Sequence, residues 1–448
     1  MTADGPAPHR WLDRSSPVAP SGAQRWGLVA VAVAVVAFVG VQQWGAHLLE
    51  QGVRLALNAP PFLARWRVEW PPGMWWALTA AVVLAIVWVP LTERLPWRAV
   101  LLGSGAVALV WPALLQGSDG WDSLYTILAD PLAYLPTAQA IDSPAEFLRT
   151  YVDRLPDHPT HVKGHPPGAT LAHWLVDLVG GGRSDVLTAT FLVIAASAAP
   201  ASLIALDRVA GRDAARRAAP FAGLAPAVIW IATSPDAMFM GVIAWAVALG
   251  AVAITAPPRW GLVAGFGAGL LAGAALSLSY GSMLLLGPLW ALAILAGVSR
   301  RWQPLVPAAV GFAVIPLWFM ALGFDWFAGL AATNEAYQAG VAPNRPAYYF
   351  LVSNLAVFAV TIGPAAVAGL ARLRDARVWW LVGGGVAAVL SANISLLSKG
   401  EVERIWLPAV PFVLLAVVAV ERRWERHVWL ALQLAVAIAL QVYVASPW

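Results

Sequence analysis

The loop between residues 116 and 168 carries the residue types that acid and base chemistry needs. It holds seven acids against three bases. Most of these acids are typical of a solvated surface, but Asp130 lies in the stretch 129–134 (ADPLAY), close to an apolar run and beside Tyr134. A carboxylate held partly out of water at a membrane interface can act as a general base toward a hydroxyl. We therefore predict that Asp130 is catalytic.

The stretch 165–168 (HPPG) follows in the same loop, immediately before another apolar stretch. Two prolines fix the backbone where a loop enters a helix, and His165 can donate a hydrogen bond to a phosphate or sugar oxygen. The alternative is a kinked helix start with no chemical role. Between the two motifs, residues 144–155 (PAEFLRTYVDRL) have apolar residues at helical spacing, which predicts a short amphipathic helix on the outer membrane surface.

Cations for an anionic substrate are few outside the arginine-rich loops. The chain has two lysines, Lys163 and Lys399, and both fall on predicted outward loops. Arg345 precedes two tyrosines in a second long loop and is a further candidate contact for a phosphate or an acceptor. Chance placement competes with function for both lysines.

The stretch 399–404 (KGEVER) is a tight charged loop between two apolar runs, where unpaired charges are costly. We predict that Arg404 binds a phosphate, with Glu403 or Glu401 as its partner or as a sugar contact. The alternative is an ordinary hairpin with a local ion pair. Asp236, at the start of another apolar run, is either a site residue or a helix cap shared with Ser234.

A metal site is weighed and not favoured. His158, His161 and His165 lie close together in the sequence with Asp157 alongside, so a divalent metal is conceivable. No motif with ligand spacing such as HExxH is present. The chain has no cysteine, which excludes disulfides and thiolate ligands. The site is therefore predicted to work without a cofactor.

The order DPLAY, amphipathic helix, HPPG resembles the GT-C superfamily of integral-membrane glycosyltransferases, particularly the branch of protein O-mannosyltransferases and aminoarabinose transferases. That branch carries an Asp-acid-x-x-Tyr motif in a long external loop and a Lys-Pro-Pro-like motif at a later helix start. The resemblance implies that Asp130 is the catalytic base, with Tyr134 and His165 supporting the site. It also implies a functional Asp236 at the outer end of a span.

Two departures from the family pattern are visible. Pro131 stands where many relatives have a second acid, so Asp119 or Asp122 would have to supply one. Two apolar runs also precede the run that leads into the motif-bearing loop. In relatives the motif usually follows the first apolar run. The resemblance spans residues 98–420 in outline, and about fifteen positions carry it.

The elements that must position these residues are membrane helices. Hydrophobic residues make up 60% of the 448 and charged residues 12%, against about 25% charged in soluble domains. Apolar runs long enough to cross a bilayer predict an all-α polytopic bundle of about thirteen spans. We place them near 27–45, 75–92, 98–115, 186–206, 218–233, 237–256, 261–279, 282–298, 303–322, 349–370, 378–397, 406–420 and 428–445.

Arginine placement predicts the orientation. Cytoplasmic loops are rich in Arg and Lys, and an inside N-terminus puts 18 of 26 arginines on one side of the membrane. This predicts a cytoplasmic tail at 1–26, a membrane domain at 27–448 in the cell membrane, and two long extracytoplasmic loops, 116–168 and 323–348. The basic charge then reflects topology, and nucleic-acid binding is not needed to explain it.

These observations predict an enzyme of the cell envelope. It would move a sugar, with inversion, from a polyprenyl-phosphate donor to a hydroxyl of a glycan, lipid or protein acceptor on the extracytoplasmic face, among membrane lipids. The first alternative is a transporter or lipid flippase, which would need charges in mid-span and broken helices. The second is a non-catalytic membrane protein that organises envelope assembly.

Overall fold

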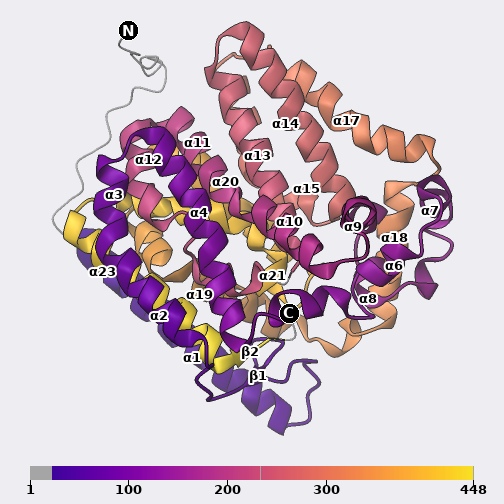
Figure 1. Cartoon of the computed structure of the whole chain (residues 1–448), viewed down its shortest axis with the longest axis horizontal. Coiled ribbons are helices and arrows are strands. Elements are labelled where there is room, and N and C mark those ends of the chain that lie inside the picture. Colours follow the sequence, from indigo (N-terminus) through magenta and orange to yellow (C-terminus); the bar gives the residue numbers. More distant parts are fainter. Residues whose placement is uncertain (1–22, 233, 447–448) are drawn as a thin grey trace.

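The computed structural model describes residues 23–232 and 234–446 (Figure 1). Most of the predicted tail at 1–26 lies outside these residues. Helices make up almost all of the described regular structure, which confirms the all-α prediction. The two short strands β1 (Arg65–Trp66) and β2 (Val444–Ala445) pair antiparallel and join the loop after the first helix to the end of the last.

The helices of ten or more residues are α1 (Ala23–Glu50), α2 (Met74–Val83), α4 (Trp97–Gln116), α9 (Pro167–Gly180), α10 (Ser184–Ala196), α11 (Ala198–Ala210), α13 (Asp236–Thr255), α14 (Pro258–Leu278), α16 (Gly287–Val298), α17 (Leu305–Ala321), α18 (Trp326–Ala339), α19 (Ala347–Arg372), α20 (Ala376–Ile394) and α23 (Arg423–Tyr443). The shorter ones are α3 (Val89–Arg94), α5 (Ser123–Thr126), α6 (Leu135–Gln139), α7 (Pro144–Thr150), α8 (Thr160–Lys163), α12 (Arg212–Ala218), α15 (Ser282–Leu285), α21 (Val402–Ile405) and α22 (Val410–Val413).

Within the described residues, nine helices are long and apolar enough to cross a membrane, or ten if α17 and α18, which meet at a 74° bend, form one span. The chain is therefore a polytopic helical membrane protein. The predicted count of about thirteen is not confirmed by these helices. Two of the predicted spans, 218–233 and 406–420, contain no long α-helix.

The first of these segments crosses the bundle as irregular chain. It links α12 to the start of α13 and contains only two short 3-10 turns, at Ala219–Phe221 and Pro226–Trp230. Pro220 and Pro226 have no amide hydrogen to donate, and Gly223 adopts a φ of 77°. Irregular backbone is tolerated at membrane depth when protein surrounds it, and nearly every residue from 219 to 232 is buried.

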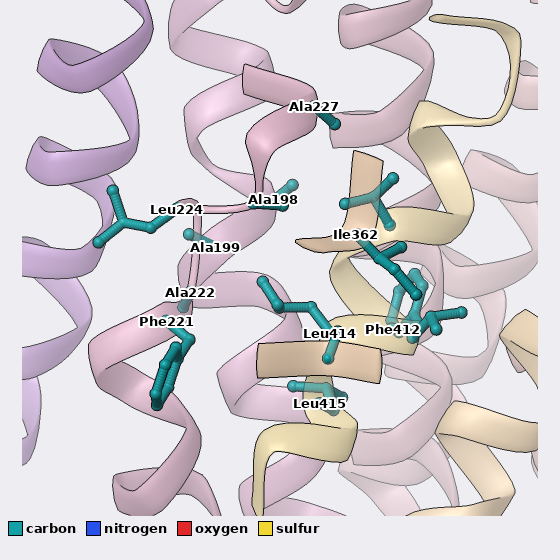
Figure 2. Packing of buried hydrophobic residues seen from close by; sticks show 14 of the residues in the cluster. Ala198, Ala199, Phe221, Ala222, Leu224, Ala227, Ile362, Phe412, Leu414 and Leu415 are labelled. Carbon is teal, nitrogen blue, oxygen red and sulfur yellow. The ribbon is translucent and has the colours of Figure 1, made fainter. Parts of the chain in front are cut away.

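The second segment, residues 402–420, also lies inside the protein as short α and 3-10 turns. The core forms where these two segments meet α11, α13 and α19. Figure 2 shows Ala198 and Ala199 of α11 beside Leu224, with Phe412 and Leu414 near Ile362. The small alanine side chains leave room for the irregular chain to pass between helices.

Glycines let two peripheral helices pack backbone to backbone. A Cβ on Gly269 of α14 would lie 1.9 Å from the carbonyl oxygen of Ala308 in α17, and one on Gly311 would lie 2.2 Å from that of Phe266. Close contacts between small residues stabilise helix pairs in lipid, where burial of apolar side chains gives little gain. Figure 1 shows α13, α14 and α17 as neighbouring helices that project from the rest of the bundle.

A break inside α19 is repaired by a side chain. Gly363 has a φ of 82° and precedes Pro364, so the helix loses backbone hydrogen bonds there. Gln433 of α23 accepts a hydrogen bond from the amide of Ala365 at 3.1 Å and donates one to the carbonyl of Ile362 at 2.6 Å. The buried amide side chain thus satisfies the freed backbone groups.

The bundle has two chemically different ends. Arginines from α12, α19 and α23 gather at one end; Arg216 donates to the carbonyl oxygens of Thr92 and Leu95, at the end of α3. The long loops gather at the other end, which we call the loop end. There the loop helix α7 has Ser143 as its N-cap, and Leu148 is almost wholly buried against the loop's own core. The apolar face predicted to rest on the membrane surface is therefore packed inside the protein.

Candidate active site

Three buried charged side chains and one partly buried one form a continuous chain of ion pairs at the loop end. Arg404 donates to Asp236 Oδ2 and to Glu401 Oε2, both at 2.7 Å, and Arg345 donates to Glu401 Oε1 at 3.1 Å. We call this set the charged cluster. It brings together the start of α13, the helix α21, the loop after α20 and the end of the second long loop.

The cluster is well shielded from water. Asp236 is 2% exposed, Arg345 5% and Arg404 7%. Burial raises the pKa of Glu401, but Arg404 and Arg345 outweigh that effect and hold the pKa below its usual range. Charges this deep are expensive unless they are paired or used. The two arginines are balanced by two carboxylates, so a phosphate entering here competes with Asp236 and Glu401.

Asp236 belongs to the charged cluster, and Ser234 supplies a capping hydrogen bond at the start of α13. Asp236 is the first residue of α13, and the cap residue Pro235 makes no side-chain hydrogen bond. Ser234 Oγ donates to Asp236 Oδ2 at 2.8 Å and accepts from its backbone amide at 3.2 Å. These contacts orient the carboxylate toward Arg404.

Lys399 and Glu403 lie next to the cluster in different states. Lys399 Nζ donates to the carbonyl oxygens of Ala342 and Arg345, at 2.9 and 3.1 Å. Glu403 is 1% exposed, and its Oε2 has no hydrogen-bond partner within the described structure. Burial raises the pKa of Glu403 to about 7. Glu401, and not Glu403, pairs with Arg404.

The two sequence motifs of the first long loop meet at Tyr134. Its hydroxyl lies 2.7 Å from His165 Nδ1, and its ring stacks on His173 at 4.6 Å between centroids. Burial raises the pKa of Tyr134, and the charge of Asp236 raises it further. Burial lowers the pKa of His165, which Asp236 partly offsets. Both side chains therefore lie within electrostatic reach of the charged cluster.

Asp130 lies on the exposed side of this loop. Its Oδ1 accepts a hydrogen bond from the amide of Leu132 at 2.7 Å, and the Leu132 carbonyl accepts one from the amide of His161 at 3.4 Å. The ADPLAY stretch is thus joined to the segment that carries His161 and His165. The Asp130 carboxylate is open to solvent, so the partial desolvation expected from its neighbours is absent.

The other predicted residues of the loop are engaged elsewhere. Lys163 Nζ donates to the carbonyl of Pro156 at 3.1 Å on the exposed surface. Asp119 pairs with Arg67 through hydrogen bonds of 2.9 and 2.7 Å, away from the charged cluster. Asp122 accepts a hydrogen bond from Tyr125. Each of the two acids considered as a companion to Asp130 thus has a partner of its own.

The described residues include no group of three His, Cys, Asp or Glu side chains placed to hold a metal ion. His158 instead stacks on Tyr151 at 5.2 Å. Burial lowers the pKa of His161 to about 4, and the positive charge of Arg404 adds to this effect. The loop histidines are thus neutral side chains at pH 7.

Sequence reasoning considered His161 only as a metal ligand and Ser234 only as a helix cap, and it missed His173 and Tyr337 as members of the site. The Tyr337 hydroxyl accepts a hydrogen bond from the amide of Lys399 at 3.3 Å. Their contacts join segments distant in sequence, which no local pattern indicates. The role of Glu401 had a local signal, because it precedes Arg404 by three residues, the spacing of a helical ion pair.

No protein-family model matches the chain, and no curated protein matches it. Among solved structures, it is similar to the crystal structure of ArnT from Cupriavidus metallidurans bound to undecaprenyl phosphate, with a TM-score of 0.40 and 16% sequence identity. The match covers 69% of this chain and 62% of that chain.

Proposed function

We propose that this protein is a membrane glycosyltransferase that moves a sugar from a polyprenyl-phosphate donor to an acceptor hydroxyl at the loop end of the bundle. The observation that carries the proposal is the charged cluster with its adjoining Lys399. It brings three cations together where helix ends meet the long loops. Cations at that depth are the direct way to hold a lipid-linked phosphate.

The donor phosphate would bind Arg404, with Lys399 and Arg345 beside it. Lys399 donates only to carbonyl oxygens among the contacts of the described structure, so a phosphate can recruit it without breaking an ion pair. Recruiting Arg404 requires Asp236 or Glu401 to give up part of its contact. The cluster would therefore release the leaving phosphate readily after transfer.

Asp130 would serve as the general base. It would accept the proton of the acceptor hydroxyl while the acceptor oxygen forms a bond to the anomeric carbon. The bond from that carbon to the phosphate oxygen would break, and the polyprenyl phosphate would leave with the electron pair. Its exposure gives Asp130 access to an acceptor arriving from solvent. Tyr134 and His165 would orient the sugar, and Asp236 and Glu403 would line its site.

Transport is the main alternative. A transporter or flippase needs ionisable residues in mid-membrane. In the nine long spans of the described chain, Asp, Glu, Lys and Arg lie near the helix ends. The broken helix α19 is repaired by Gln433, a neutral side chain. These observations favour an enzyme with its chemistry at one end of the bundle.

The test is transfer of a radiolabelled sugar from its polyprenyl phosphate by the purified protein. We expect Asp130→Asn to lower the transfer rate by about 100-fold or more, because a positioned general base contributes at least that factor. Asp142→Asn, an exposed acid of the same loop, is the matched control and should leave the rate unchanged. Full activity of Asp130→Asn would remove Asp130 from the mechanism, and donor binding without turnover would favour a non-catalytic protein.

A further inference from the structure

A second set of charges lies at the arginine-rich end of the bundle, far from the charged cluster. Glu93, in the last turn of α3, is contacted by two arginines of α23. Arg423 Nε lies 3.1 Å from Glu93 Oε2, and Arg426 donates to Oε1 at 2.9 Å. Arg217 of α12 is close enough to repel Arg426 electrostatically. Two arginines thus share one carboxylate, and the positive charge of Arg217 lies near them.

This excess of positive over negative charge is partly buried. Arg426 is 9% exposed. The Nε atoms of Arg426 and Arg217 are buried and have no hydrogen-bond partner in the described structure. Glu425, the acid beside Arg426 in the sequence, does not supply the missing charge, because it pairs with Arg372 at 2.9 Å. Excess positive charge at partial burial is costly unless an anion balances it. Among the ion pairs of the described structure, Arg423 and Arg426 have only the one carboxylate of Glu93 between them.

The surroundings indicate where a further negative partner comes from. The Arg423 side chain is 51% exposed, so the site opens outward. Trp424, beside it, is 59% exposed, and Trp26 of α1 is 62% exposed. Exposed tryptophans at the ends of membrane helices lie at the level of lipid headgroups. Basic pockets between helices at that level bind the phosphates of anionic lipids.

We infer that Arg423 and Arg426, which both contact Glu93, form with the nearby Arg217 a binding site for the phosphate headgroup of an anionic phospholipid. The guanidinium groups match a phosphate better than ammonium groups do, because each presents two parallel donors. Glu93 holds the two α23 arginines in place and competes with the lipid for them. The site is independent of the proposed glycosyl transfer.

Because Glu93 competes with the lipid phosphate for the arginines, variants of Glu93 and of Arg423 should change lipid binding in opposite directions. The full-length protein in detergent is titrated with phosphatidylglycerol, and bound lipid is counted by native mass spectrometry. We expect Arg423→Gln to weaken binding about fivefold, since one surface arginine contributes about 1 kcal/mol toward an anionic lipid. Glu93→Gln should tighten binding, because it removes the competing carboxylate. A merely structural pair would show weaker or unchanged binding for both variants.

Three controls decide the outcome. Arg374→Gln removes one exposed arginine from the same end and should leave the affinity unchanged. Phosphatidylcholine, which has no net charge, should bind more weakly than phosphatidylglycerol. Inorganic phosphate distinguishes a lipid headgroup from a free anion. Equal losses for Arg423→Gln and Arg374→Gln, tighter binding of phosphatidylcholine, or saturation by phosphate alone would each overturn the inference.

Discussion

At the scale of single residues, Glu403 is the acid whose protonation is most coupled to the fold. It is buried beside two arginines that other carboxylates already neutralise. Its pKa rises from an ordinary value of 4.5 to about 7, chiefly because burial disfavours the charged form. Near pH 7 the side chain can therefore hold or release a proton inside the proposed site.

This predicts a pH dependence of stability. Between about pH 4.5 and 7 the folded protein keeps the Glu403 proton and the unfolded chain loses it, so stability falls as the pH rises through this window. Glu403→Gln should remove that part of the fall. Thermal unfolding midpoints in detergent, measured from pH 4.5 to 8, should show the two proteins diverging as the pH rises, with the variant more stable at pH 8. Parallel curves would contradict a proton on Glu403.

Sequence alone predicted several residues of the site but not their pairing. Arg404 was selected because unpaired charges in a tight loop between apolar runs are costly. Lys399 was selected because it is one of only two lysines, Arg345 because it precedes two tyrosines in a long loop, and Asp236 because it begins an apolar run and the family resemblance implies it. The structure brings all four to the loop end. The partner of Asp236 could not be predicted, since Arg404 is 168 residues away and their contact depends on how α13 and α21 pack. Asp130 was selected from a motif, and its exposure was not visible in that motif.

At the scale of elements, the charged cluster acts as a clamp among α13, α21 and the second long loop. The removal of one partner from a buried ion pair leaves an uncompensated charge, which typically costs about 3 kcal/mol or more. We expect Asp236→Asn to lower the free energy of unfolding by about that amount. SDS titration in mixed micelles measures it.

A variant of a more exposed ion pair shows how much of this stability cost comes from burial. Asp207 pairs with Arg212 at 2.8 Å, but Arg212 is 46% exposed there. Asp207→Asn should therefore cost less than about 1 kcal/mol. The double variant Asp236→Asn with Arg404→Met should recover much of the lost stability, because no unpaired charge remains. Equal costs for the two single variants would show that the cluster is not a clamp.

The irregular segments 219–232 and 402–420 show where element prediction fails. Hydropathy predicts helical spans at 218–233 and 406–420, because both runs are apolar. Their prolines and Gly223 break the helical hydrogen bonds, and the surrounding alanines of α11 allow the chain to pass as buried irregular backbone. Hydropathy measures burial and does not distinguish burial in lipid from burial in protein.

At the scale of the whole molecule, the arginine distribution predicts which end faces the cytoplasm. The chain has no cysteine, so a single introduced cysteine reports sidedness without background. Asp153→Cys at the loop end should react with a membrane-impermeant maleimide in intact cells. Arg300→Cys at the opposite end should react only after permeabilisation. Both positions are exposed. The reverse pattern would place the charged cluster on the cytoplasmic face.

The central claim is that the charged cluster holds the phosphate of a polyprenyl-phosphate lipid. An experimental structure of the full-length protein with undecaprenyl phosphate tests it most directly. We predict the phosphate within hydrogen-bonding distance of Arg404 or Lys399, with at least one contact of Arg404 to Asp236 or Glu401 lengthened. A phosphate bound only beside Glu93 at the opposite end, with the cluster unchanged, would contradict the account.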